Sequence, residues 1–176
     1  MLNSITRGIA KVFGTKADKD LKVLMPYVAL VNTEHKKLSN ISDEQLRGKT
    51  RELKDEINAR LKFTDDQISD LQKNVDENPD LDINEKESLF AQIDSLEESR
   101  DVELEKVLIE LLPRAFAVVK ETARRFTENH KLTVQATIED KQLAANRPHI
   151  EINGETAIWH NKWLASGTEV VWNMIH

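Results

Sequence analysis

Apolar residues recur along this chain mainly at intervals of three and four, the spacing of amphipathic helices. The first stripe consists of Leu2, Ile5, Ile9, Val12 and Phe13. Gly14 follows this stripe and is a residue suited to the end of a helix. A second helix is predicted after Thr15 and carries apolar residues as far as Val31. Pro26 lies inside it and predicts a kink or a restart there.

Two capping patterns and a proline divide the middle of the chain. Ser42 to Gln45 (SDEQ) is a capping box that predicts a helix start, with inward residues from Leu46 to Leu61. Thr64 to Gln67 (TDDQ) repeats this pattern, and the apolar spacing then continues until Asn78-Pro79. A long helix is predicted from about Asn84, so residues 63–110 are expected to form an antiparallel helical hairpin.

Pro113 interrupts the next stretch, either as a kink or as the first position of a new helix. The helix expected from Ala115 to Phe126 (AFAVVKETARRF) is nearly uncharged on one side. It is therefore predicted to be the most buried helix of the chain.

The period changes to two after this helix. Leu132 to Ile138 alternates apolar and polar residues, which predicts a strand. In HIEINGETAIWH, Asn153-Gly154 predicts a type I′ hairpin turn. This hairpin places Ile150, Ile152, Ala157 and Trp159 on one face and His149, Glu151, Thr156 and His160 on the other, with the two histidines diagonal. Three strands in a meander are expected from Leu132 to Trp163, and a last helix from about Ser166.

These elements predict a mainly α, helix-dominated α+β fold: a helical bundle with a long antiparallel helical hairpin and a small antiparallel β-meander near the C-terminus. The length of 176 residues fits one domain, or one domain with an excursion.

Charge is distributed unevenly over these segments. Residues 64–110 contain 16 acidic and 4 basic side chains, although the net charge of the whole chain is only −6. This balance disfavours a nucleic-acid-binding protein. No run of 18 apolar residues occurs, and the N-terminus has no apolar core of a signal peptide. The absence of cysteine excludes disulfides and fits a reducing cytoplasm.

Two short patterns resemble chemical sites without meeting their requirements. Gly48-Lys49-Thr50 ends like a phosphate-binding loop, but it is expected inside a helix and lacks the upstream glycine. His149, His160 and Glu151 offer zinc-ligand types on one hairpin face, but no fourth ligand is apparent. We therefore assign no catalytic, cofactor-binding or metal-binding residues, and read these histidines as solvated or hydrogen-bonded imidazoles.

The N-terminal stripe is the strongest candidate for a functional surface. Its apolar side and its basic side chains together are typical of a helix that lies at a membrane interface. The residues that would contact anionic lipid are Leu2, Ile5, Arg7, Ile9, Lys11, Val12, Phe13 and Lys16. The alternative is that this stripe packs on the rest of its own protein.

Three stretches resemble the N-terminus of the SecA family, the motor ATPases of bacterial preprotein translocation. They are KVFGTKADKDLK (11–22), LSNISDEQLRGKTRELK (38–54) and LLPRAFAVVKETARR (111–125). The final residues 172–176 resemble the beginning of the family segment that precedes its nucleotide-contacting motifs. The resemblance covers residues 1–54, 111–125 and 172–176, and segments 63–110 and 127–169 are unusual beside typical relatives. It implies that the chain is one N-terminal segment of a larger protein. The implied parts are leader and scaffold helices (1–62), an acidic helical hairpin insertion (63–110), a core helix (111–126), a β-rich insertion (127–169) and the truncated start of a helix of a nucleotide-binding domain (170–176).

The resemblance implies a cytoplasmic protein, peripheral at the inner membrane, whose parent uses ATP and Mg to drive unfolded preproteins through the SecY channel complex. It also implies that the residues of the N-terminal stripe, with Arg7, Lys11 and Lys16, contact anionic phospholipid or this channel. Helices around Leu46–Leu61 and Ala115–Arg125 would scaffold the motor, while this chain, without a phosphate-binding loop, would be inactive alone. The alternative is a stand-alone, non-enzymatic helical module for protein interaction.

Overall fold

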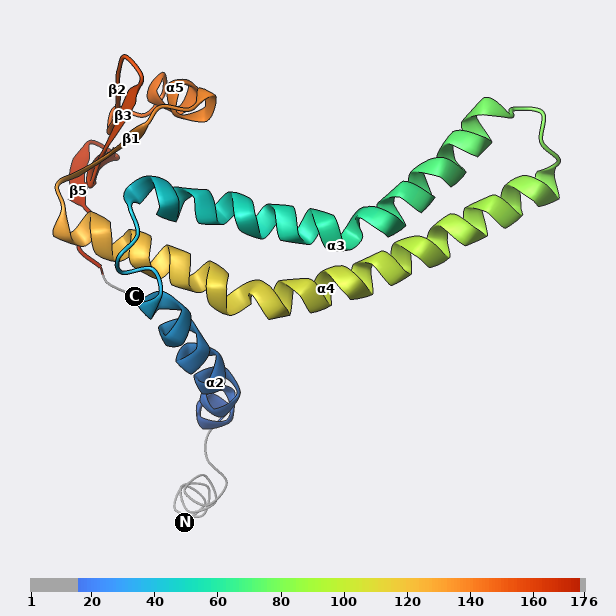
Figure 1. Ribbon diagram of the computed structural model, residues 1–176, viewed down its shortest axis with the longest axis horizontal. Helices are drawn as coiled ribbons and strands as arrows, with labels where there is room; N and C mark the ends of the chain where they lie inside the picture. The colour runs from blue at the N-terminus through green and yellow to red at the C-terminus, as the bar shows by residue number, and fades with distance from the viewer. Residues whose placement is uncertain (1–15, 175–176) are drawn as a thin grey trace, which may run out of the picture. The chain divides into compact units, whose positions relative to one another are not determined.

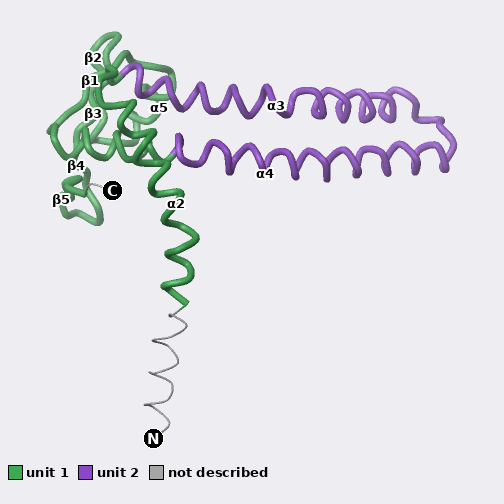
Figure 2. Tube along the Cα trace, turned by 60° about the horizontal axis from the view of Figure 1, so that its bottom comes forward, with its two compact units in different colours: residues 1–43, 116–176 green, residues 44–115 purple. Residues whose placement is uncertain are grey.

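The computed structural model describes residues 16–174 (Figure 1). Its elements are α2 (Lys16–Lys36), α3 (Asp43–Glu77), α4 (Ile83–Glu128), β1 (Lys131–Gln135), α5 (Ile138–Ala144), β2 (Ile150–Asn153), β3 (Thr156–His160), β4 (Lys162–Ala165) and β5 (Thr168–Val171). The helix-dominated α+β class is thus confirmed. The chain forms two compact units: unit 1 comprises Met1–Asp43 and Phe116–His176, and unit 2 comprises Glu44–Ala115 (Figure 2).

Unit 2 is an antiparallel helical hairpin, as the fold class predicted, but it begins well before the predicted segment 63–110. Ion pairs join Glu56 to Arg114 and Arg60 to Glu110, so residue numbers rise along α3 as they fall along α4. The buried apolar residues of the hairpin recur at helical spacing on both helices, as a two-helix seam requires. They are Leu46, Leu61 and Ile68 on α3 and Ile93, Val107 and Leu111 on α4.

Both helices of the hairpin are longer than the sequence pattern predicted. α3 continues through the second capping pattern at Thr64, because Leu61 and Ile68 occupy the same buried face seven residues apart. α4 likewise continues through Pro113, so no new helix begins there. In α2, Pro26 also lies inside a continuous helix.

The β-rich part of unit 1 contains a three-stranded antiparallel sheet with strand order β1-β3-β2. The strand order therefore differs from the expected sequential meander, since β1 pairs with β3. Between β1 and β2 the chain forms α5, which the sequence analysis did not predict. Thr137 and Asp140 form a capping box at its start, and this ends the strand pattern before Ile138.

The β2–β3 hairpin has the predicted faces but a different turn. Ile150 pairs with Trp159 and Ile152 with Ala157, as expected for residues on one face. The turn residues are Gly154 and Glu155 rather than Asn153 and Gly154, because Asn153 pairs with Thr156. Gly154 takes the first central position with φ 63°, which glycine adopts at little steric cost.

The prediction of a last helix from about Ser166 is wrong. Residues 162–171 form an antiparallel hairpin, β4–β5, in which Ala165 pairs with Thr168. Ser166 and Gly167 are the two turn residues and both have positive φ, of 51° and 82°. This two-residue turn matches the twist of antiparallel strands, and the β-branched residues after it favour a strand over a helix.

Candidate functional site

The predicted membrane or channel surface falls largely beyond the described part of the chain. Leu2, Ile5, Arg7, Ile9, Lys11, Val12 and Phe13 all lie outside the described residues, and their assignment stays a prediction. Lys16 is described; it is the first residue of α2 and is exposed. Among residues 16–174, no helix combines the length and the apolar composition that a membrane span requires.

Helix α2 exposes an unusual amount of apolar surface. None of its residues is buried, although the helix contains many large aliphatic side chains. Those that are exposed are Leu21, Val23, Leu24, Met25, Val28 and Leu30. An exposed apolar patch of this kind is typical of a surface that contacts another part of a protein, another protein or a membrane.

A densely connected polar cluster lies on α4 within unit 1, around Glu121. The Glu121 side chain is completely buried and accepts hydrogen bonds from Arg124 and from Arg125, the latter at 2.8 Å. His35 Nε2 of α2 lies 3.0 Å from Glu121 Oε2. A second polar contact of α2 comes from Lys120 Nζ, which donates to Asn32 Oδ1 at 2.8 Å. Two side-chain contacts thus connect the C-terminal part of α2 to α4.

Arg125 connects the same cluster to the loop between α2 and α3. Its guanidinium donates to the backbone oxygens of Leu38 and Ile41, at 3.2 and 2.8 Å, and forms an ion pair with Asp43 at 2.5 Å. Asp43 is the first residue of α3. Arg125 therefore fixes the path of the chain between two helices, and we call Glu121, Arg124, Arg125, His35 and Asp43 the Glu121 cluster.

The electrostatics of Glu121 indicate a structural role. Burial raises the pKa of this carboxyl, but hydrogen bonds and charge from Arg124 and Arg125 outweigh it and lower the pKa to about 2. The carboxylate is consequently ionised at neutral pH and occupied by donors. A general base needs a pKa nearer the working pH and a free acceptor site, so Glu121 does not meet the requirements of a catalytic base.

The sequence analysis missed the Glu121 cluster. The local signal was Glu121 followed by arginines three and four residues later, a spacing that places all three side chains on one helix face. That spacing commonly marks an exposed ion pair. The burial and the contacts with His35 and Asp43 come from residues more than 80 positions away along the chain.

The structure agrees with the assignment of Gly48-Lys49-Thr50 to a helix surface. All three residues lie inside α3, and Lys49 Nζ donates to both oxygens of Glu52, at 2.9 and 2.8 Å. A phosphate-binding loop presents unoccupied backbone N–H groups at a turn between a strand and a helix. The described residues at this position do not fit ATP phosphates.

The two histidines of the β2–β3 hairpin face each other across the strands rather than diagonally. His160 N donates to the backbone oxygen of His149 at 2.9 Å, and His160 Nε2 lies 2.8 Å from Glu151 Oε1. Burial, with the charges of Arg147 and His160, lowers the pKa of His149. Within residues 16–174, no group of three or more potential ligands is arranged to hold a metal ion.

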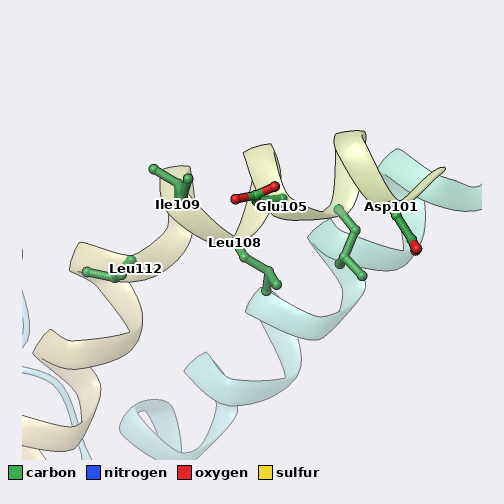
Figure 3. A pocket seen from close by; sticks show the side chains of 6 residues that line it. Asp101, Glu105, Leu108, Ile109 and Leu112 are labelled. Atoms are coloured by element: carbon green, nitrogen blue, oxygen red, sulfur yellow. The ribbon is translucent and has the colours of Figure 1, made fainter. Parts of the chain in front are cut away.

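In unit 2, one stretch of α4 lines a shallow pocket of about 280 Å³ (Figure 3). Its apolar lining residues are exposed or half-buried and sit next to two carboxylates. The lining residues are Asp101, Leu104, Glu105, Leu108, Ile109 and Leu112. The pocket offers apolar contact with acidic groups at one end, an arrangement suited to binding rather than to catalysis.

Comparison with known proteins connects these features to one family. A family model described as the SecA DEAD-like domain matches residues 9–140. Proteins named "Protein translocase subunit SecA" are similar over nearly the whole chain: the one from Cytophaga hutchinsonii is 51% identical over 96% of it, and the one from Flavobacterium psychrophilum is 44% identical over 98%. The chain spans only 15% of the length of either relative. No solved structure matches it.

These matches also run through segments 63–110 and 127–169, since they cover more than nine-tenths of the chain. In the protein from Amoebophilus asiaticus the identity is 42% over 94% of the chain. Both segments are therefore part of the similarity to these proteins.

Proposed function

This chain belongs to the SecA family, and we propose from that premise that it forms the N-terminal part of an ATP-driven protein translocase. The observation that carries the proposal is the similarity of almost the whole chain to proteins named as translocase subunits. The complete protein would be cytoplasmic and peripheral at the inner membrane. Its partners would be unfolded preproteins, the SecY channel complex and anionic phospholipid.

Within this protein, we assign a scaffolding role to the described helices. Phe116 and Val119 of α4 are more than half exposed, and α2 has no buried residue. Burial of these exposed apolar side chains against another surface would contribute about 25 cal/mol of stabilisation per Å² removed from water. The remaining parts of the translocase would cover them, while the Glu121 cluster holds the connection between α2 and α3 in place.

The first test separates the complete translocase from this chain. The complete protein is expected to hydrolyse ATP with Mg and to move a preprotein into inverted membrane vesicles, where the preprotein resists added protease. The isolated 176-residue chain is expected to show no ATP turnover above background, because its sequence has no phosphate-binding loop and Gly48-Lys49-Thr50 lies inside a helix. Turnover by the isolated chain would contradict the second expectation, and failure of ATP-dependent transport would contradict the first.

A second test addresses membrane contact through residues 1–13. In liposome flotation, the chain is expected to bind vesicles that contain anionic phospholipid more strongly than a version without these residues. The reason is that Arg7 and Lys11 accompany an apolar stripe, and each basic group near an anionic surface contributes about 1 kcal/mol. Equal flotation of both versions would instead favour docking of this stripe on its own protein.

A further inference from the structure

One face of α4 in unit 2 changes from acidic to apolar along its length. Asp94, Glu98, Asp101 and Glu105 follow one another at intervals of four, three and four residues, so they line a single helix face. All four are exposed. Leu108 and Leu112 continue the same spacing, and this acidic-to-apolar face therefore has two chemically distinct halves.

The pocket on α4 lies where the two halves meet. Asp101 and Glu105 line it together with four aliphatic side chains, and Figure 3 shows these residues along consecutive turns of α4. Leu108 and Ile109 are each 48% exposed, although both are large and aliphatic. The apolar half is consequently accessible and has a hollow that a side chain could fill.

The carboxylates of the acidic half have little internal compensation. Among residues 16–174, Asp94, Glu98 and Glu105 form no ion pair, and Asp101 has only a long contact of 3.9 Å with Arg100. Elsewhere in the same hairpin, Arg60 and Arg114 pair with carboxylates of the facing helix. The acidic half thus retains its negative potential, which attracts a cationic partner.

We propose that this face binds a helical segment of another protein that has lysines or arginines at one end and large aliphatic residues at the other. The basic end contacts the acidic half, from Asp94 to Glu105. The aliphatic end packs on Leu108, Ile109 and Leu112. Such a segment packs as an amphipathic helix on the face of α4, with side chains one turn apart as anchors. The proposal concerns unit 2 alone and does not depend on the transport function.

Charge complementarity favours this occupant over two others. An anionic lipid surface is repelled by the acidic half. A second copy of the same face would bring carboxylates against carboxylates in a parallel pair, or against leucines in an antiparallel pair. The first arrangement is repulsive, and the second desolvates charges without a partner.

The experiment measures fluorescence anisotropy of a labelled helical peptide with three lysines at one-turn spacing followed by leucines at one-turn spacing. The 176-residue chain is expected to bind it, with affinity that falls as salt rises. The double variant Glu98→Lys, Glu105→Lys is expected to weaken binding about tenfold or more. Leu108→Ser is also expected to weaken binding, and circular dichroism checks that each variant retains its helix content.

The matched control reverses two exposed charges on the other helix of the hairpin, Asp70→Lys and Asp76→Lys, which gives the same net charge. This control is expected to retain most of the affinity. Equal weakening by both double variants would overturn the proposal, since it would show attraction to net charge only. Unchanged binding in Leu108→Ser would also overturn the proposal, as would equal binding of a peptide with glutamine in place of lysine. Self-association of the chain through this face, measured by sedimentation, would overturn it as well.

Discussion

Glu121→Ala is expected to lower the free energy of unfolding by about 3 to 5 kcal/mol, the usual cost of removing one partner from a buried ion pair. The substitution removes the carboxylate that Arg125 and Arg124 contact and leaves the Arg125 guanidinium buried. The hydrogen bond to His35 is lost at the same time. Chemical denaturation followed by circular dichroism measures the change.

Glu128→Ala is the matched control for this substitution. Glu128 lies on the same helix and also pairs with Arg124, but its side chain is half exposed. An exposed pair contributes at most about 1 kcal/mol, so the control is expected to change stability little. Similar losses in the two variants would show that the burial of Glu121 adds nothing.

The low pKa of Glu121 also gives a direction for the effect of pH. The pKa falls from 4.5 to about 2 in the folded chain, so the ionised carboxylate stabilises the fold above the unfolded value. This contribution is lost as the pH falls from 4.5 towards 2. In Glu121→Gln that part of the acid dependence is expected to disappear.

Val107→Ala is expected to destabilise the hairpin of unit 2 by about 2 kcal/mol, from the loss of two buried methyl groups and the cavity that they leave. Val107 is 1% exposed and lies on the buried face of α4. Hydrogen exchange of α3 and α4 amides, together with denaturant unfolding, measures the loss.

Val102→Ala provides a control with the same change of side chain on the same helix. Val102 is 66% exposed, so its truncation removes little buried surface and is expected to change stability by less than about 0.5 kcal/mol. A loss at Val102 as large as that at Val107 would contradict burial as the cause, since the change from valine to alanine by itself raises helix propensity.

The helical hairpin could be predicted from the sequence because its signals are local. The apolar spacing identified both helices, and Asn78-Pro79 marked the break between them. The prediction of a second helix start at Thr64 was wrong, because contacts between the two helices outweigh the local capping pattern. A capping pattern is worth about 1 kcal/mol, which is less than the burial of Leu61 and Ile68 on a continuous face.

The β4–β5 hairpin and the Glu121 cluster show two further limits. The apolar run from Val170 fits either a helix or a strand by period alone, and Ser166-Gly167 was the turn signal that decides between them. For the Glu121 cluster, the sequence shows the two arginines that follow Glu121. It does not show that His35 and Asp43 join them, because only the tertiary fold brings these residues to the cluster.

The acidic surplus between residues 64 and 110 also influences how copies of this protein behave in a crowded solution. Phe63, Ile83 and Phe90 are exposed aromatic or aliphatic side chains on the hairpin, and neutral helices that carry such residues tend to aggregate. With 16 acidic against 4 basic groups, two such hairpins repel each other before these side chains meet. The repulsion is screened beyond about 8 Å at physiological salt, so colloidal solubility of the chain depends on ionic strength.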